Sequence, residues 1–500
     1  MKKIYNPNDL SLKLDFLRKK NKKIVLCHGV FDLLHSGHIN HLQQAKEKGD
    51  ILVVSITDDK FVNKGPGRPA FPFKDRAQVI ASLGIVDYVT INQDFSSINI
   101  IKKIKPNVYC KGPDYLDFKS DYTKKIILEK KAVESVGGKI FFSTGQTKSS
   151  TKVINKYSSI YNESQKTFFG KFKNKKKLDI IKIFNELKKL NVLIVGEIIL
   201  DKYVFCESLG KSGKESILTF RKLNTEVYNG GSLAVANHLS SFVSNIDLIS
   251  YVGKNKSFLN KNLSKNIHFK FIKKKNTETI EKTRFVDHLD NRKITGIYNI
   301  NDNFLNNLEE KKLISHLKNI KKYDLVIVVD YGHGLITEKI AKILGKKSKY
   351  LCVNAQVNSA NIGYHSLRKY SNANNITING LELRHETKDR FSDIYYLANK
   401  LKKEIKAKTM IVTQGKNGAF LLDEKNKIFK CPAFATKVVD KVGSGDAMFA
   451  ISSVLLNKKI DKNFVLLASS LAAGLSVETI GNSLKIDSLN LMKSIEHIFK

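Results

Sequence analysis

The chain is 500 residues long, with 42% hydrophobic residues and a formal net charge of +39 at pH 7. This length and apolar content predict two or three domains, each with its own hydrophobic core. No apolar run is long enough to span a bilayer and no signal-peptide layout is present, so we expect no membrane-embedded role.

The positive charge is mostly lysine and is spread along the whole chain. Because a nucleic-acid groove gathers arginine and aromatic residues, this pattern favours a solvated basic surface without a specific nucleic-acid partner. The five cysteines are far apart and show neither zinc-site spacing nor a disulfide framework. We therefore expect a cytoplasmic protein in a reducing setting.

Short apolar runs alternate with helical patterns at the start of the chain. The predicted strands lie at 24–30, 51–56, 86–91, 107–111 and 139–143, and the helices include 37–48 and 74–83. Alternating strands and helices predict an α/β fold with a doubly wound parallel sheet, and this first domain is expected to cover residues 1–155.

A histidine-containing segment follows the first predicted strand. Residues 28–38 read His-Gly-Val-Phe-Asp-Leu-Leu-His-Ser-Gly-His. His35 and His38 are three positions apart, so they share one face of the helix that begins there. The start of a helix carries unpaired N–H groups and the positive end of its dipole, which attract phosphate. Two imidazoles at this place can donate hydrogen bonds to charge that builds up on a phosphoryl group.

This segment resembles the HxGH signature of the cytidylyltransferase-like nucleotidyltransferases, a family with a Rossmann-like fold. Three further stretches resemble the family and occur in its order: Lys64-Gly-Pro-Gly-Arg-Pro, Tyr109-Cys-Lys-Gly-Pro-Asp-Tyr and Ser149-Ser-Thr-Lys. The resemblance implies attack by a substrate phosphate on the α-phosphorus of a nucleoside triphosphate, with release of pyrophosphate.

The same resemblance implies roles for individual residues. His35 and His38 would hold the transferred α-phosphate, and Lys64 would neutralise phosphate charge as a mobile cation. Ser150 and Thr151 would hold the leaving phosphates at a helix start. The other nucleotide-binding candidates are Gly29, Phe31, Gly37 and Lys111, while Asp114 would face the base or the acceptor.

A polar, lysine-rich stretch at 156–177 predicts a linker, followed by a helix at about 178–189. A second α/β domain is then expected over residues 178–500. Its predicted strands lie near 192–195, 247–252, 325–329, 350–353, 375–378, 410–413 and 418–422.

A second signature lies far down the chain, where Asp440-Lys-Val-Gly-Ser-Gly-Asp446 precedes a predicted helix at 446–457. Gly443, Ser444 and Gly445 can bring successive N–H groups together into an anion-holding nest at the helix start. Asp446 at that point can take the proton from a hydroxyl that attacks the γ-phosphate of ATP.

This loop resembles that of the ribokinase (phosphofructokinase-B-type) sugar kinases, and residues 191–500 carry further marks of that family in order. Asp201, Gly230, Gly231 and Asn237 resemble the sugar-binding positions. Thr413, Gly415 and Gly418 match the ATP-side motif, and Asn379 and Glu382 match the motif that serves magnesium and phosphate. Segments 216–228 and 282–300 would form a small β lid over the sugar. Asn354 and Gln356 stand where heptose kinases carry a charged pair.

Together the two resemblances imply a bifunctional enzyme like those of ADP-heptose synthesis, with the domain order reversed. It would phosphorylate a sugar, such as a heptose phosphate, with ATP and Mg²⁺. It would also transfer a nucleotidyl group from ATP or CTP to a sugar phosphate for glycan precursors such as lipopolysaccharide. Both families commonly self-associate, which implies a homo-oligomer. Two alternatives stay open: a polyol-phosphate cytidylyltransferase fused to a kinase for an unrelated sugar, and a non-catalytic nucleotide- or nucleic-acid-binding protein.

Overall fold

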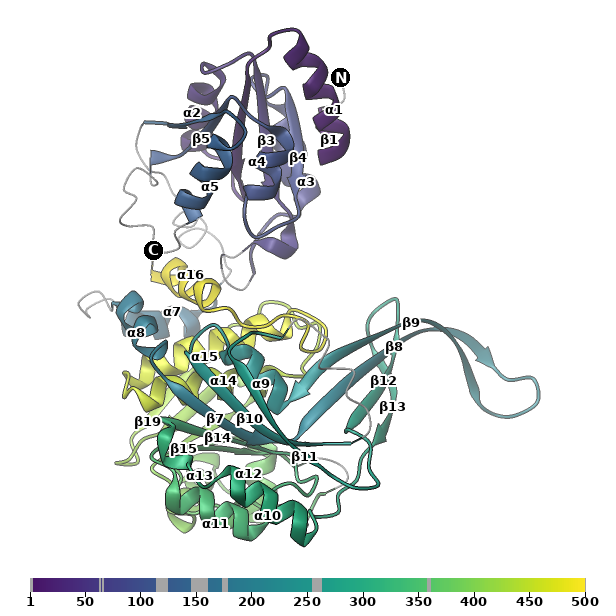
Figure 1. Cartoon of the computed structure of the whole chain (residues 1–500), viewed down its shortest axis with the longest axis vertical. Helices are drawn as coiled ribbons and strands as arrows, with labels where there is room; N and C mark the ends of the chain where they lie inside the picture. The colour runs from purple at the N-terminus through teal and green to yellow at the C-terminus, as the bar shows by residue number, and fades with distance from the viewer. Residues whose placement is uncertain are drawn as a thin grey trace. The chain divides into compact units, whose positions relative to one another are not determined.

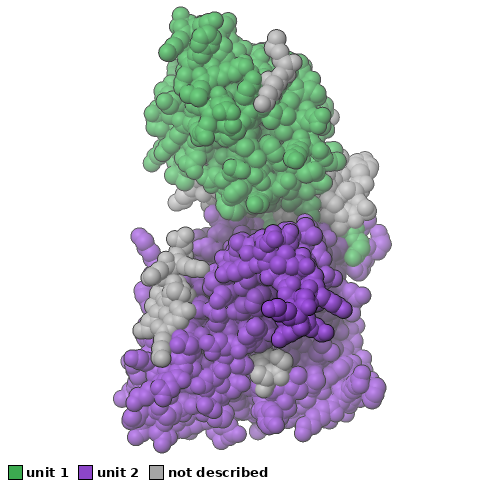
Figure 2. Space-filling view, turned by 90° about the vertical axis from the view of Figure 1, so that its right-hand side faces the viewer, with its two compact units in different colours: residues 1–162, 492–500 green, residues 163–491 purple. Residues whose placement is uncertain are grey.

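The structure is a computed structural model that describes residues 3–62, 64, 67–113, 125–144, 161–172, 179–253, 263–357 and 361–499. The chain forms two compact units, one of residues 1–162 and 492–500 and the other of residues 163–491. Figure 2 draws them in separate colours. Each unit is described by itself.

Unit 1 is built on a six-stranded sheet in the order β1-β4-β3-β2-β5-β6, and all its neighbouring strands are parallel. Its strands are β1 (Ile4–Tyr5), β2 (Ile24–Gly29), β3 (Ile51–Thr57), β4 (Tyr88–Asn92), β5 (Val108–Lys111) and β6 (Lys139–Phe142). The order runs outward in both directions from the pair β2 and β5. The sheet therefore has a topological switch point between these two strands, where ligands bind at the carboxyl ends.

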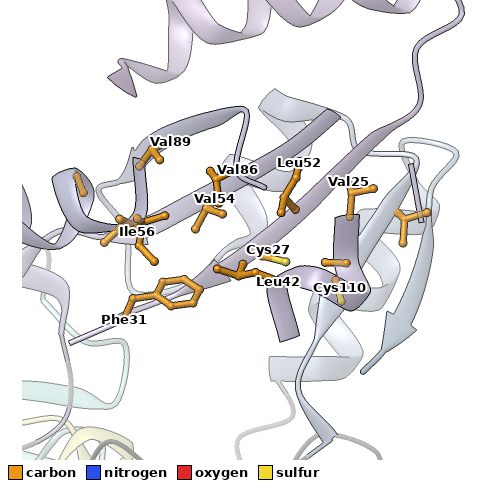
Figure 3. Close-up of a cluster of buried hydrophobic side chains, with 14 residues drawn as sticks. Val25, Cys27, Phe31, Leu42, Leu52, Val54, Ile56, Val86, Val89 and Cys110 are labelled. Atoms are coloured by element: carbon orange, nitrogen blue, oxygen red, sulfur yellow. The ribbon is translucent and has the colours of Figure 1, made fainter. Parts of the chain in front are cut away.

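The helices of unit 1 are α1 (Pro7–Lys19), α2 (Ser36–Lys46), α3 (Phe73–Ser82), α4 (Ile98–Ile104) and α5 (Lys125–Glu134). Two apolar clusters hold them to the sheet. One joins α2 and α3 to the sheet through residues such as Leu42 and Ile80 (Figure 3). The other includes Leu10 and Leu14 of α1 and Ile101 of α4. Helices thus cover both faces, which makes the sheet doubly wound.

Unit 2 has a nine-stranded sheet in the order β11-β10-β7-β14-β15-β16-β17-β18-β19. Its strands are β7 (Asn191–Gly196), β10 (Asn245–Val252), β11 (Ile267–Lys273), β14 (Leu325–Asp330), β15 (Leu351–Ala355), β16 (Asn375–Asn379), β17 (Thr409–Thr413), β18 (Ala419–Leu422) and β19 (Ile428–Cys431). The pairs are parallel from β11 to β17, and β18 and β19 add an antiparallel edge.

Helices cover both faces of this sheet. They are α7 (Glu163–Gly170), α8 (Ile180–Leu187), α9 (Ser232–Leu239), α10 (Asn307–His316), α11 (Glu338–Lys347), α12 (Gly380–Thr387), α13 (Ile394–Glu404), α14 (Ser444–Asn457) and α15 (Lys462–Val477). The last helix, α16 (Ser488–Phe499), belongs to unit 1 from Met492 onward. Figure 1 shows α9, α14 and α15 on one face and α10 to α13 on the other. Helix α14 is buried along most of its length, so it is a core element of the kind that is apolar all round.

A second, four-stranded sheet with the order β13-β12-β8-β9 adjoins the large sheet of unit 2. It is formed by β8 (Ile198–Lys211), β9 (Leu218–Gly231), β12 (Glu281–Asp287) and β13 (Lys293–Asn299). Its hairpin of β8 and β9 extends as a long arm beyond β12 and β13 (Figure 1). This sheet contains the two segments predicted to form a β lid.

The predicted fold class, two doubly wound α/β domains of which the second is ribokinase-like with a small β sheet, is confirmed. The sequence did not predict β1, α1, β8, β11 or β19. None of the helices among the described residues has the length and apolar character needed to cross a membrane.

The segment predicted as a linker, 156–177, is described only at 161–172, and there it contains helix α7. Phe168 and Phe172 are 2% and 7% exposed, and the Phe169 ring stacks on that of Phe434 at 5.5 Å. The lysine-rich composition led to the linker prediction, but these three aromatic side chains bury apolar surface within unit 2.

Candidate active sites

The first candidate site lies at the carboxyl ends of β2, β3 and β5, at the switch point of the unit 1 sheet. His28 is at the end of β2, where its Nδ1 lies 3.2 Å from Ser55 Oγ of the adjacent strand. The chain then turns through residues 30–35 and enters α2. The HxGH segment thus occupies the place where doubly wound sheets bind ligands.

The two predicted histidines lie together at the start of α2. His35 is the N-cap residue, and its Nδ1 accepts a hydrogen bond from the Gly37 N–H at 3.1 Å. The rings of His35 and His38 stack with centroids 4.0 Å apart, and the Phe31 ring meets His38 edge-on at 5.3 Å. A Cβ built on Gly29 would lie only 3.0 Å from the Phe31 ring, which is a tight contact. Glycine at position 29 therefore makes room for the aromatic ring that supports His38.

The pKa of His38 is lowered to about 3, chiefly by burial and then by charge repulsion from His35 and Lys64. His38 is therefore neutral at pH 7 and offers an N–H group rather than a positive charge. Lys64 is close enough to act electrostatically on His38, so the structure brings these three predicted residues to one place.

The loop after β3 is fixed to this site by Arg68, which belongs to the Lys64-Gly-Pro-Gly-Arg-Pro stretch, and by Arg76, which no motif singled out. Arg68 Nη1 lies 3.1 Å from the buried Asp32 Oδ2, and Asp32 Oδ1 accepts the Ala70 N–H at 2.7 Å. Arg76 donates to the carbonyls of Val30 and Thr57, which follow β2 and end β3. The Gly-x-Phe-Asp sequence signalled Asp32, but its partner became visible only in the fold.

Lys111 ends β5 and is buried, with its Nζ 2.7 Å from Glu129 Oε2. Glu129 also accepts from Ser97 Oγ at 2.6 Å, and Ser97 accepts from Tyr109 at 2.9 Å. The ammonium group of Lys111 is therefore held by a carboxylate inside unit 1. Three other residues considered for this site, Asp114, Ser150 and Thr151, lie outside the described residues.

The second candidate site centres on Asp446, at the start of α14 in unit 2. Its Oδ1 accepts hydrogen bonds from the Tyr331 hydroxyl at 2.9 Å and from Gln356 Nε2 at 3.1 Å. The pKa of Asp446 is raised to about 7, chiefly by burial and also by the charge of Asp201, against the lowering effect of the two hydrogen bonds. A carboxyl group with this pKa can give and take a proton near neutral pH.

The glycine loop before α14 has the predicted form. Gly443 has a φ of 86°, and a Cβ there would overlap the side-chain oxygen of Asn482. Ser444 and Gly445 are the first residues of α14, and Ser444 Oγ donates to the Lys441 carbonyl at 3.1 Å. The first N–H groups of a helix have no acceptor within the helix, and Asp446 lies in the same first turn of α14.

The predicted sugar-binding residues lie next to the small sheet. Asp201, on β8, is 4% exposed and pairs with Arg284 Nη1 of β12 at 2.5 Å. Gly230 lies on the neighbouring strand β9, in register with Ile199, and a Cβ there would overlap Asp201 Oδ2. Gly231 has a φ of 61° and caps α9, which carries Asn237. The structure thus brings Asp201, Gly230 and Gly231 together.

Basic side chains from the small sheet enter the same region, and sequence reading missed them. Lys282 on β12 is 8% exposed, and its Nζ lies 5.6 Å from the centre of the Tyr331 ring. Burial lowers its pKa, which Asp201 partly offsets. Lys293 on β13 forms an ion pair with Asp440, the first residue of the glycine loop. Only the pairing of distant strands could have revealed these cations.

Asn379 and Glu382 form a capping box at the start of α12. Asn379 Oδ1 accepts the N–H groups of Leu381 and Glu382, and Glu382 Oε2 accepts the Asn379 N–H at 3.0 Å. The pKa of Glu382 is raised to about 7, chiefly by burial and also by the charge of Asp446. Two buried carboxyl groups thus act on each other here, and their oxygens suit Mg²⁺.

The predicted ATP-side motif lies at the end of β17. Thr413 is its last residue and pairs in register with Asn379. Gly415 opens a 3-10 turn to Asn417 with a φ of 56°, and Gly418 has a φ of 83°. The amide pair Asn354 and Gln356 lies beside Asp446. Gln356 Nε2 donates hydrogen bonds to Asn354 Oδ1 at 2.9 Å and to Asp446 Oδ1.

Two family models match the chain. One, described as pfkB family carbohydrate kinase, matches residues 189–488, and the other, described as Cytidylyltransferase-like, matches residues 26–156. The two resemblances drawn from the motifs, in this domain order, are therefore confirmed.

Curated relatives match the N-terminal part of the chain. The Bifunctional protein HldE of Desulfatibacillum aliphaticivorans is 38% identical over 149 residues, which are 29% of each protein. Its namesake from Geobacter metallireducens is 37% identical over 164 residues, 32% of each protein. That of Campylobacter concisus is 43% identical over 124 residues, 24% of this chain and 26% of that protein. The matches thus span about a third or less of these relatives.

Solved structures resemble unit 2. Phosphofructokinase-2 from Escherichia coli in complex with substrates and products superposes with a TM-score of 0.53 at 14% identity, over 62% of this chain and 100% of that one. The potassium complex of the same protein gives a TM-score of 0.51 at 15% identity, with the same coverage. At these identities the likeness shows the fold.

Proposed function

The chain belongs to the pfkB family of carbohydrate kinases, and from that premise we propose that unit 2 phosphorylates a sugar with ATP while unit 1 transfers a nucleotidyl group to a sugar phosphate. The observation that carries the proposal is Asp446, a buried carboxyl group with a pKa of about 7 at the glycine-led start of α14.

In the kinase reaction, Asp446 accepts the proton of a sugar hydroxyl as its oxygen attacks the γ-phosphorus of ATP. The new O–P bond forms while the bond between the γ-phosphorus and the bridging oxygen breaks, and ADP leaves. The N–H groups at Gly443 to Gly445 stabilise the charge on the transferred group. Tyr331 and Gln356 hold the Asp446 carboxylate in place through their hydrogen bonds.

The sugar is proposed to lie between Asp201 and Asp446. Asp201 binds hydroxyl groups, and Arg284 keeps its carboxylate ionised and oriented. Lys282 adds a second cation beside Tyr331, and among the described residues no carboxylate lies within ion-pair distance of its ammonium group. A buried cation without a carboxylate partner suits an anionic substrate, which favours a sugar that already carries a phosphate.

Mg²⁺ neutralises the charge of the ATP phosphates when it is bound. Glu382 suits this ion because its carboxyl group is buried, has a raised pKa and lies within the field of Asp446. Asn379 uses its side-chain oxygen to cap α12, so the proposal assigns the ion to Glu382, through water, and leaves Asn379 as the cap.

In unit 1, His35 and His38 donate hydrogen bonds to the α-phosphate of the nucleoside triphosphate, and Lys64 neutralises its charge. Because His38 is neutral in the free site, an arriving triphosphate gains an N–H donor without first displacing another anion. The acceptor phosphate attacks the α-phosphorus, and pyrophosphate leaves. Gly37 keeps the helix start open to the phosphates.

The proposed substrate is a heptose phosphate or a related sugar phosphate, with ATP or CTP as the nucleotidyl donor, in the synthesis of a glycan precursor. The support for this assignment is the order of motifs in both units and the similarity to bifunctional relatives. The amide pair Asn354 and Gln356 beside Asp446 distinguishes this chain from kinases that carry charges there.

The test uses the full-length protein with two assays. ADP release is measured with ATP over a panel of sugars and sugar phosphates, and pyrophosphate release with ATP or CTP over sugar 1-phosphates and glycerol 3-phosphate. We expect Asp446→Asn to lower ADP release by about 10²–10⁴-fold and to spare pyrophosphate release. His38→Ala should do the reverse.

Two exposed residues provide matched controls. Asp393 caps α13, and asparagine is an equally good N-cap, so Asp393→Asn should change neither activity. His385→Ala on the surface of α12 serves as the control for His38→Ala. Absence of turnover over both panels, or loss of both activities in one folded variant, would contradict the proposal. Salt-dependent nucleic-acid binding with no turnover would favour the non-catalytic alternative.

A further inference from the structure

Two cysteines and a histidine that the nucleotide chemistry does not use meet inside unit 1. Cys27 on β2 and Cys110 on β5 are direct partners in the register of these parallel strands, and both are fully buried. They lie side by side in the apolar cluster of Figure 3. His41 of α2 completes the group, because its Nδ1 is 3.9 Å from Cys110 Sγ.

One potential ligand atom from each residue lies within 4.8 Å of the other two. In the part of the chain that the structure describes, this is the one group of three or more cysteine, histidine or acidic residues that is so arranged. Sequence spacing does not predict this group, because the two cysteines are far apart and show no zinc-site pattern.

The donor set selects the chemistry. Thiolates and imidazole are the ligands of Zn²⁺ and of softer ions, whereas Mg²⁺ and Ca²⁺ need oxygen. Zinc bonds of about 2.3 Å to sulfur and about 2.0–2.1 Å to nitrogen place tetrahedral ligand atoms roughly 3.5–3.8 Å apart. The contact between Cys110 and His41 is already near that value, so the site needs only a small contraction.

A neighbouring hydroxyl supports the histidine. Ser143 Oγ lies 2.8 Å from His41 Nδ1 and 3.3 Å from the Lys111 carbonyl, and Ser143 is 1% exposed. This hydroxyl holds the ring so that Nδ1 faces the sulfur atoms, and Nδ1 exchanges its contact with Ser143 for the ion when the ion binds. His41 itself is half-buried, whereas the two thiols are fully buried.

We propose that Cys27, His41 and Cys110 bind one Zn²⁺ ion within unit 1, as three protein ligands. Binding replaces the two thiol protons, which are released to solvent, and forms two bonds from sulfur and one from nitrogen to the ion. Water held near Ser143 takes the fourth position.

The place of the site in the fold gives the ion a positioning role. His41 follows His38 by three residues, so both lie on one face of α2. An ion shared by His41, Cys27 and Cys110 ties the first turns of α2 to β2 and β5, the strands that flank the switch point. This consequence rests on the proposed function, whereas the binding itself does not.

The experiment uses the full-length protein, stripped of metal with a chelator under a reductant that does not bind metal. Co²⁺ is titrated as a probe, because its thiolate complexes absorb in the near ultraviolet and its tetrahedral complexes absorb in the visible. Zn²⁺ is then added to displace it, and bound zinc is counted by elemental analysis. We expect one equivalent and a thiolate-to-cobalt band.

The variants Cys27→Ala, Cys110→Val and His41→Asn should each weaken zinc binding by more than about 10–100-fold. Cys110→Val keeps an apolar side chain in the cluster, so it guards against loss of folding. Cys352→Ser and Cys431→Ser remove buried thiols of unit 2 and should keep one equivalent. His38→Ala should also keep it, which separates this result from failure of the proposed function.

Absence of cobalt or zinc uptake by the reduced protein would overturn the proposal, as would uptake that persists in both cysteine variants. Formation of a disulfide between Cys27 and Cys110, detected as a loss of two mass units without metal uptake, would show instead that the pair is a redox couple.

Discussion

Two substitutions of Gln356 should shift the pH dependence of the kinase reaction in opposite directions. Gln356 Nε2 donates to Asp446 Oδ1 at 3.1 Å, and this bond lowers the pKa of a carboxyl group that burial raises to about 7. The base must be ionised, so turnover of the parent enzyme should rise with pH through about 7. Gln356→Leu removes the donor, whereas Gln356→Lys replaces it with a cation.

The sizes of the two shifts follow from the geometry. A hydrogen bond to a charged group contributes about 1.5–3 kcal/mol, and one pKa unit corresponds to about 1.4 kcal/mol. Loss of this bond in Gln356→Leu should therefore move the midpoint of the acid limb of the pH–rate profile upward by about 1–2 pH units. A cation within a few ångströms lowers the pKa of a carboxyl group by about 1–3 units, so Gln356→Lys should move the limb downward by that amount.

The assay is the kcat for ADP release at saturating ATP and sugar, measured from pH 5 to 9.5. At saturation the limb reports the base in the bound enzyme. Gln93→Leu, at an exposed position of unit 1, is the matched control and should leave the limb in place. If the limb of the lysine variant stays at the parent value or moves upward, Asp446 is not the titrating base.

Three further outcomes concern stability. The pKa of Asp446 in the folded protein lies well above its usual value, so the free energy of unfolding should fall as pH rises from about 4 to about 7. Asp446→Asn removes this penalty, so it should raise the Tm at pH 8, and the gain should disappear below about pH 4. Gly443→Ala adds a Cβ at a φ of 86° against Asn482 and should lower the free energy of unfolding by about 1–3 kcal/mol; an unchanged urea midpoint would refute the strain. Arg284→Met strands the buried Asp201 carboxylate and should destabilise unit 2 by about 3–5 kcal/mol, most of which Asp201→Asn should restore in a double-mutant cycle.

Much of the fold could be predicted because its central strands are buried on both faces. The sequences of β2, β3 and β14 are nearly continuous apolar runs, which is the pattern expected for strands inside a parallel sheet. β8 and the outer half of β9 mix charged and apolar residues, so they give no such run. Helix α1 carried a start signal in Asn6 followed by Pro7, but its sequence is strongly polar.

The candidate sites were predictable where one short segment supplies the geometry. The spacing of His35 and His38, and the loop before Asp446, each lie within a single turn of chain. Contacts between distant elements were not predictable, because they depend on the sheet order. Lys282 reaches Tyr331 from the small sheet, and Cys27 meets Cys110 across the switch point.

The close approach of Gly230 to Asp201 has an evolutionary consequence. Any side chain at position 230 would occupy the space of the Asp201 carboxylate. A lineage that retains the acid can therefore accept only glycine at 230, while one that has lost it is released from that restriction. Among descendants of this gene, positions 201 and 230 should therefore change together, with glycine at 230 wherever aspartate is kept at 201.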